Sequence, residues 1–127
     1  MREGLTSSSD PRATRRVGPL RVLFLCSRNR RRSPTAERLF GGRPDLQVAS
    51  AGLAPDAEEV VTPDLLDWAE VIVVMEPAHR SRLQRQFGAH IRHARVTCLN
   101  IKDDYEFMDA ALIELLRLRA SPHLHRR

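Results

Sequence analysis

The stretch LRVLFLCSRNRRRSP, residues 20–34, decides the fold of this chain. Its first six residues are almost all apolar, which is typical of a strand buried on both faces. Ser33 and Pro34 are residue types that helices favour at the N-cap and at the first helical position, so a helix is expected over 33–40. The Cys, Arg and other polar residues between the two form a loop. The stretch therefore predicts strand, loop and helix in direct succession.

Apolar runs and turn residues divide the rest of the chain in the same alternating way. Strands are expected over 46–50, 71–75 and 95–101, and further helices over 62–68, 77–87 and 107–118. Strands that alternate with helices favour a parallel sheet covered by helices on both faces, with right-handed crossovers. The predicted fold class is therefore α/β, and ligands in such folds bind at the carboxyl ends of the strands.

Length and charge place these elements in one domain with a basic tail at each end. The chain has 127 residues, which suits a single domain, expected over residues 19–120. Residues 1–18 are rich in Ser, Arg, Pro and Gly without a period and are expected to be disordered, and residues 121–127 to be a frayed tail. Each tail carries a net charge of +2 out of +5 for the chain. The basic composition therefore does not by itself indicate a nucleic-acid partner.

Several classes of protein are disfavoured by what the sequence lacks. No apolar run is long enough to cross a membrane, and no signal-peptide segment is recognisable. Two cysteines are too few for a disulfide scaffold, so a cytoplasmic protein is expected. His79 and Arg80 follow the third strand and could reach the mouth of the site, but a surface role at a helix start is favoured. The remaining histidines stand in pairs without companion ligands, so no metal is expected at His90, His93, His123 or His125.

The loop after the first strand has the composition of an anion site. Backbone N–H groups in a loop that enters a helix, together with the helix dipole, attract a negative group. The same field favours the thiolate of Cys26, which makes it a candidate nucleophile. Arg32 can grip two phosphate oxygens through its planar fork, and the Ser33 hydroxyl can donate to the sulfur. A buried cysteine beside a solvated run of arginines would have the same sequence.

The segment LFLCSRNRRRSPTAE resembles the signature of the low-molecular-weight protein tyrosine phosphatases, Cys-x-x-Asn-x-x-Arg-Ser-Pro followed by Ala-Glu. Ala49–Gly52 and Trp68–Met75 also resemble segments of that family, and the resemblance covers about residues 20–119. It implies a short, compact, bacterial-type member: a three-layer α/β/α fold whose four parallel strands have the order 2-1-3-4. It also implies a phosphocysteine mechanism without metal or cofactor. The phosphate-binding loop would contact substrate through Ser27, Arg28, Asn29, Arg30, Arg31 and Ser33.

The resemblance also implies a general acid after the last strand, where the family has Asp-Pro-Tyr. This chain has Asp103, Asp104 and Tyr105 at that point. Aligning the tyrosines makes Asp103 the acid, with Asp104 as the rival. Adjacent carboxylates raise the pKa of one of them, which suits an acid that must hold a proton. Tyr105 is expected to wall the pocket or to pack in the core.

Three features depart from the family. Arg31 stands where the family often has a second, protective cysteine, and Cys98 is expected to be a buried core thiol. The segment after Gly52 is short and offers no aromatic residue to frame the substrate. Arg28 and Arg30 join Arg31 around the loop, where they either raise the positive potential for acidic substrates or are simply solvated.

These residues favour a phosphate monoester hydrolase, a protein tyrosine phosphatase with Cys26 as nucleophile, Arg32 on the phosphoryl oxygens and Asp103 or Asp104 as acid. Expected partners are a phosphorylated protein or a small phosphate monoester, with inorganic phosphate or sulfate as site ligands, and a monomer or weak dimer. A membrane or nucleic acid is not expected as partner. Two alternatives stay open. One is a catalytically weak phosphate- or nucleic-acid-binding module, although the Arg run contains no aromatic residue on which bases could stack. The other is an arsenate reductase-like enzyme, which would need further thiols.

Overall fold

A computed structural model describes residues 18–126; residues 1–17 and 127 lie outside the description, and with them most of the predicted disordered tail, residues 1–18. Four parallel strands form one sheet in the order β2-β1-β3-β4, as predicted. The elements are β1 (Leu20–Cys26), α2 (Arg32–Phe40), β2 (Leu46–Gly52), α3 (Pro63–Trp68), β3 (Val71–Val74), α4 (Pro77–Phe87), η2 (Gly88–His90), β4 (Arg95–Cys98), α5 (Ala110–Ala120) and η3 (Ser121–His123).

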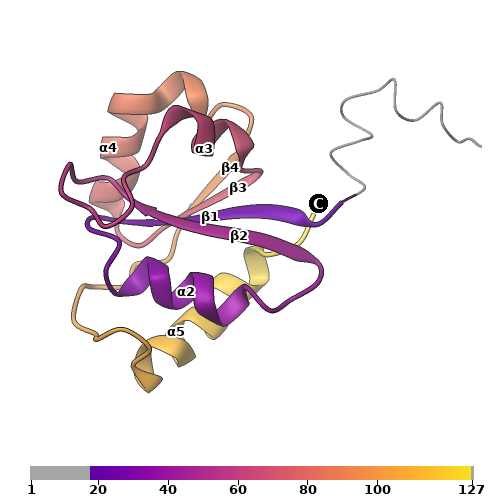
Figure 1. The fold of residues 1–127 in the computed structure, drawn as a ribbon, viewed down its shortest axis with the longest axis vertical. Coiled ribbons are helices and arrows are strands. Elements are labelled where there is room, and N and C mark those ends of the chain that lie inside the picture. The colour runs from indigo at the N-terminus through magenta and orange to yellow at the C-terminus, as the bar shows by residue number, and fades with distance from the viewer. Residues whose placement is uncertain (1–17, 127) are drawn as a thin grey trace, which may run out of the picture.

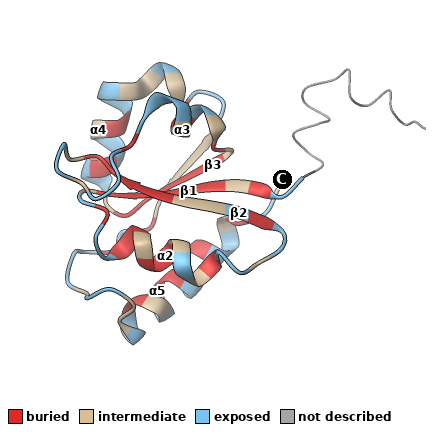
Figure 2. Ribbon diagram, in the orientation of Figure 1, coloured by how far each residue is buried: buried red, intermediate tan, exposed pale blue. Residues whose placement is uncertain are grey.

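The sheet separates two layers of helices, and each layer has its own core (Figure 1). Helices α2 and α5 cover one face, and α3 and α4 cover the other. Residues alternate between the two cores along β1: Phe24 packs on the α2 side, where its ring stacks on Phe40 at 5.8 Å, while Leu23 and Leu25 pack on the other. Burial on both faces explains why β1 is an apolar run, and Figure 2 shows it largely buried.

Strand register brings the loops at the carboxyl edge together. Cys26 pairs with Gly52 across β1 and β2, and Leu25 pairs with Val74 across β1 and β3. The segments that follow these three strands therefore start side by side. This edge is where an α/β fold binds its ligands.

The last helix is later and the last strand shorter than predicted. Helix α5 begins at Ala110 instead of residue 107, because Met108 has a φ of 62° and the Asp109 side chain caps the helix at the N–H of Ala111 (2.8 Å). Phe107 is left 46% exposed. Strand β4 ends at Cys98 instead of residue 101, and Asn100 has a φ of 56° that breaks the regular strand, although Ile101 still donates to the carbonyl of Met75 (2.8 Å).

Residues 121–126 differ from the frayed tail that was expected. They form η3 and bring Leu124 into the core beside α5 with 1% exposure. Arg126 binds the Glu70 carboxylate (3.0 Å) and the carbonyl of Gly18 (2.9 Å), so the last described residue contacts the first described one. Leu124 is the only apolar residue other than proline in residues 121–127 and stands between two histidines, so the sequence shows no apolar periodicity that would predict this docking. None of the helices within residues 18–126 is long and apolar enough to cross a membrane.

Candidate active site

The loop between β1 and α2 is held from outside by its carbonyl groups. The carbonyls of Cys26, Ser27 and Arg28 accept hydrogen bonds from the N–H groups of Leu53 (3.0 Å), Ala54 (2.8 Å) and Glu58 (3.0 Å). In a trans peptide the C=O and the next N–H point in opposite directions. The N–H groups of residues 27, 28 and 29 therefore point toward the inside of the loop, where an anion is attracted.

Gly52 allows the loop to lie this close to β2. A Cβ atom at this position would lie 2.5 Å from the Ser27 carbonyl oxygen and 2.6 Å from the Cβ of Ala57. Gly52 is also tied on both sides, since its N–H donates to Glu59 and its carbonyl accepts from Val61. The segment after β2 thus forms the outer wall of the loop, and only glycine fits at the contact.

Cys26 lies at the floor of the loop with 3% exposure. Its sulfur lies 2.9 Å from the Ser33 hydroxyl and accepts from the backbone N–H of Asn29 at 3.2 Å. The Asn29 side chain donates to the same Ser33 hydroxyl oxygen (2.9 Å), so the proton of Ser33 is free to point at the sulfur. The backbone N–H of Asn29 and the hydroxyl of Ser33 therefore both contact the sulfur.

Ser33 has a different role from the helix cap that was predicted. Helix α2 begins at Arg32, and its N-cap position, Arg31, makes no side-chain capping bond. The hydroxyl of Ser33 is turned to the sulfur and to Asn29 instead. The Ser-Pro pair therefore predicted the position of the helix correctly, but the Ser33 hydroxyl contacts Cys26 and does not cap the helix.

Asn29 links the loop to β2 and α2. It is buried (6% exposed) with a φ of 56°, in the left-handed region that asparagine tolerates better than most residues. Its side-chain N–H₂ also donates to the Ser50 hydroxyl (2.9 Å), which in turn donates to the Glu37 carboxylate (2.5 Å). Sequence reasoning did not assign Ser50 or Glu37 to the site.

Arg32 is clamped at the first position of α2. Its guanidinium is 3% exposed and donates through Nη1 to Glu76 Oε2 (2.6 Å) and to the carbonyl of Ile101 (2.7 Å). Its Nε lies 3.6 Å from a carboxylate oxygen of Asp103. A buried arginine with two fixed partners has little freedom to move, and Arg32 lines the same pocket as Cys26. Glu76 was also missed, and its position just after β3 was the available signal.

A pocket of about 300 Å³ opens above the sulfur. The side chain of Asp103 takes part in its lining, whereas Asp104 and Tyr105 do not. Tyr105 packs against the core on the α2 side instead. The complete lining is Cys26, Ser27, Arg28, Arg30, Arg31, Arg32 and Asp103, so it contains no aromatic residue.

The three exposed arginines of the mouth have acidic neighbours. Arg28 faces Asp56 (3.7 Å), Arg30 faces Glu58 (3.5 Å), and Arg31 lies 3.9 Å from both Asp103 and Glu106. The arginine side chains are 59%, 50% and 45% exposed, so these pairs contribute little to stability. Their acids reduce the positive potential that the arginine run alone suggested, although it is the arginines that line the pocket.

His79 reaches the site, and the expectation that it is a surface residue was wrong. It is 5% exposed, and its Nε2 lies 3.2 Å from the Ser27 hydroxyl. Burial and then the positive charge of Arg32 lower the pKa of His79 below its ordinary 6.5. Helix α4 starts at the carboxyl edge of the sheet, and this position was the signal that could have found it. Arg80 binds the carbonyl of Val96 (2.8 Å).

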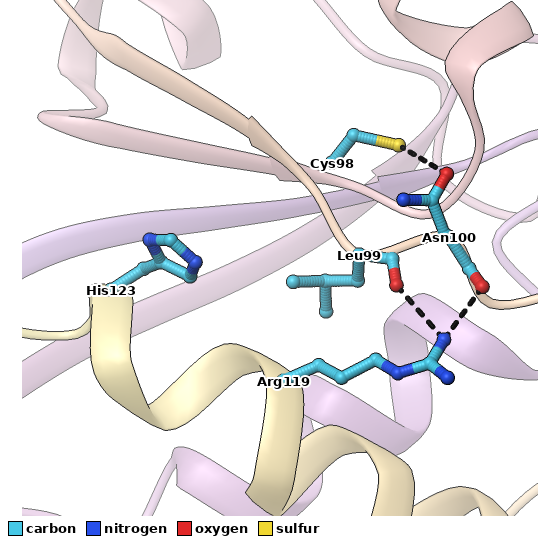
Figure 3. A pocket seen from close by; sticks show the side chains of 5 residues that line it. All are labelled: Cys98, Leu99, Asn100, Arg119 and His123. Carbon is cyan, nitrogen blue, oxygen red and sulfur yellow. Dashed lines mark hydrogen bonds between the residues drawn. The ribbon is translucent and has the colours of Figure 1, made fainter.

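Cys98 is half-buried and not the fully buried core thiol that was expected. It is also not placed to form a disulfide with Cys26. The two cysteines pack on opposite faces of the sheet. Cys98 lies at the outer edge of β4, in a second hollow where Arg119 donates to the carbonyls of Leu99 (3.1 Å) and Asn100 (2.7 Å) (Figure 3). Within residues 18–126 no group of three His, Cys, Asp or Glu side chains is arranged to hold a metal ion.

Comparison with solved structures identifies the fold. The tyrosine phosphatase AmsI of Erwinia amylovora is 24% identical with a TM-score of 0.65, over 84% of this chain and 93% of AmsI. The tyrosine phosphatase Wzb of Escherichia coli K30, solved with phosphate, is 20% identical with a TM-score of 0.65, over 82% and 95%. The YwlE arginine phosphatase of Geobacillus stearothermophilus is 21% identical with a TM-score of 0.62, over 86% and 99%.

The chain therefore has the fold of the low-molecular-weight protein tyrosine phosphatases, as its sequence predicted, with Cys26 at the end of the first strand. Comparison by sequence adds nothing to this, since no family profile and no curated protein matches the chain.

Proposed function

We propose that this protein is a cysteine-dependent phosphate monoester hydrolase that acts on phosphotyrosine. The observation that carries the proposal is the loop around Cys26, where the sulfur, inward-pointing N–H groups and the buried fork of Arg32 converge on one pocket. A thiolate among fixed donors can attack a phosphoryl group, and the donors stabilise the charge that develops on its oxygens. The fold adds support, since solved structures that share it include phosphatases.

In the first step the Cys26 thiolate attacks phosphorus and the ester P–O bond breaks. The loop N–H groups and Arg32 hold the three phosphoryl oxygens in the plane between attacking and leaving groups. Asp103 gives its proton to the leaving oxygen, which yields a neutral phenol. Asp103 is favoured over Asp104 because Asp103 lines the pocket and lies 3.6 Å from the Nε of Arg32.

In the second step water attacks the phosphocysteine and the P–S bond breaks. Asp103 now accepts the proton of the water, and the products are inorganic phosphate and the Cys26 thiolate. A solved structure with the same fold, a cysteine-to-serine mutant of the YwlE arginine phosphatase, carries a phosphorylated active-site serine. That covalent species belongs to YwlE, and it supports the same chemistry here.

Neighbours of this fold act on two kinds of phosphorylated residue, tyrosine and arginine. The side chains that line this pocket carry four positive charges and one negative charge. They disfavour the guanidinium of phosphoarginine, whereas guanidinium planes can stack on the phenyl ring of phosphotyrosine. Phosphotyrosine is therefore the substrate we propose, on a protein or a small ester, for a cytoplasmic enzyme that is a monomer or weak dimer.

Arsenate reduction is disfavoured because its electrons need a second thiol, and Cys98 packs on the opposite face of the sheet from Cys26. A phosphate-binding module without turnover would not need Asp103 in the pocket.

Hydrolysis of p-nitrophenyl phosphate in the presence of EDTA tests the proposal. The wild type should turn over, Cys26→Ser should not, and Asp103→Asn should lose about 10²–10⁴-fold in rate, as removal of a general acid does. Asp104→Asn is the matched control and should stay near wild type. Wild-type turnover no greater than that of Cys26→Ser, with inorganic phosphate still bound, would leave only a binding module.

A further inference from the structure

His79 lies behind the phosphate-binding loop, on an element that is not part of it. It is the third residue of α4, which starts where β3 ends at the carboxyl edge of the sheet. Its ring is 5% exposed, and it contacts the loop through the hydroxyl of Ser27. A buried, polar ring at this place needs partners for both of its nitrogens.

The partners fix which nitrogen of His79 carries the proton. The backbone N–H of Glu76 can only donate, and it lies 3.1 Å from Nδ1, so Nδ1 accepts and has no proton. The neutral ring therefore carries its proton on Nε2. Nε2 lies 3.2 Å from the Ser27 hydroxyl oxygen and is the donor of that bond.

This assignment decides where the hydroxyl proton of Ser27 points. Its oxygen already accepts from His79, so its own proton is directed away from the ring. Ser27 is part of the pocket lining beside Cys26 and Arg32, where the phosphoryl oxygens of a substrate would be the acceptors. We propose that His79 is a positioning residue that turns the Ser27 hydroxyl into a donor for the phosphoryl group, an inference that rests on the proposed phosphatase function.

The arrangement requires a neutral His79. A proton on Nδ1 would face the N–H of Glu76, donor against donor, and the ring would have to leave its place. The charged groups that face the ring are Glu76, with Oε2 at 3.9 Å from Nε2, Arg32, Asp103 and Arg82. Burial and the two arginines keep the pKa of His79 low and outweigh the two carboxylates.

Three variants separate this role from simple packing. Ser27→Ala removes the hydroxyl, His79→Leu removes the donor behind it, and His79→Gln keeps an N–H at the place of Nε2. We expect Ser27→Ala and His79→Leu each to lower kcat/KM for p-nitrophenyl phosphate by about tenfold, the usual effect of one hydrogen bond to a charged group. The double variant should lose no more than Ser27→Ala alone, and His79→Gln should keep most of the activity.

The pH profile adds a readout that packing does not affect. The ratio of kcat/KM between wild type and His79→Gln should stay flat down through pH 6.5 and fall only at lower pH, because the pKa of His79 is lowered by burial and glutamine has no proton to gain. His93→Leu is the control, since this exposed histidine binds the carbonyl of Ala69 (2.9 Å) and does not line the pocket. It should leave activity unchanged.

Binding of inorganic phosphate, measured by calorimetry, keeps this inference apart from the proposed function. If the wild type binds phosphate without turnover, the phosphatase proposal fails, and weaker binding to Ser27→Ala still supports the hydroxyl donor. The inference is overturned if Ser27→Ala binds phosphate and turns over as the wild type does. It is also overturned if the losses from Ser27→Ala and His79→Leu add up in the double variant. Should His79→Leu not fold, Ser27→Ala and the pH ratio of His79→Gln decide.

Discussion

Replacing Gly52 by alanine would displace the phosphate-binding loop from the segment that follows β2. The new Cβ would lie 2.5 Å from the Ser27 carbonyl oxygen, whereas ordinary contacts begin at 3.4 Å. The Ser27 carbonyl and the backbone of Gly52 are both hydrogen-bonded in place, so the loop must retreat by about 0.9 Å. A misplacement of about 1 Å in a catalytic geometry costs about 100-fold in rate. Overpacking of this kind also costs about 1–3 kcal/mol in the free energy of unfolding.

Two assays on Gly52→Ala measure these effects separately. Steady-state hydrolysis of p-nitrophenyl phosphate should show kcat lower by about two orders of magnitude. Thermal unfolding should show a Tm lower by about 4 °C for each kcal/mol lost. Gly42→Ala is the control, since its Cβ would have no atom within 4 Å, and it should leave both values near wild type. A folded Gly52→Ala with wild-type kcat would refute the claim that this contact sets the loop.

Glu76→Gln should raise KM by about tenfold, because it removes the charge that holds Arg32, whose Nη1 lies 2.6 Å from Glu76 Oε2. Steady-state kinetics measures this, with Glu114→Gln as the surface control. Asn29→Ala should lower kcat and the urea midpoint together, because it loses two side-chain hydrogen bonds and puts alanine at a φ of 56°. Leu124→Ala should lower the free energy of unfolding by about 2–5 kcal/mol in urea titrations and leave KM unchanged; an unchanged midpoint would mean that the last residues are not docked. The pKa of His79 is lowered on folding, so the unfolded chain binds the extra proton and stability should fall as pH drops below 6.5; His79→Gln should weaken this pH dependence of the urea midpoint.

The fold was predictable because its central strands are buried and its helices begin at proline or capping residues. The short apolar runs of β1 and β3 are typical of strands buried on both faces, and their alternation with helices favours a parallel sheet. Boundaries were less predictable, because positive φ angles at Asn100 and Met108 set the ends of β4 and α5. Asparagine adopts such angles more often than most residues but does not require them, and methionine gives no signal of them.

The parts of the site that lie within one segment were also predictable. Cys26, Arg32 and the loop between them are adjacent in sequence, and they meet in the pocket with Asp103. Glu76 was not assigned to the site and His79 was expected at the surface, because their roles depend on the register that brings the end of β3 beside β1. A carboxylate and an imidazole at a helix start have several ordinary explanations, and only the distances to Arg32 and Ser27 select one.

Arg80 of α4 and Arg119 of α5 bind backbone carbonyls along the outer edge of β4 and just after it, which should reduce aggregation at high protein concentration. An unpaired edge strand is a template on which another chain can add a strand and begin to aggregate. Arg80 covers the carbonyl of Val96 within β4, and Arg119 covers those of Leu99 and Asn100 just after the strand ends, so these acceptors already hold a hydrogen bond. Guanidinium groups stay charged at every pH at which a protein folds. Resistance to edge-to-edge assembly should therefore persist where a lysine or histidine at the same places would have lost its charge.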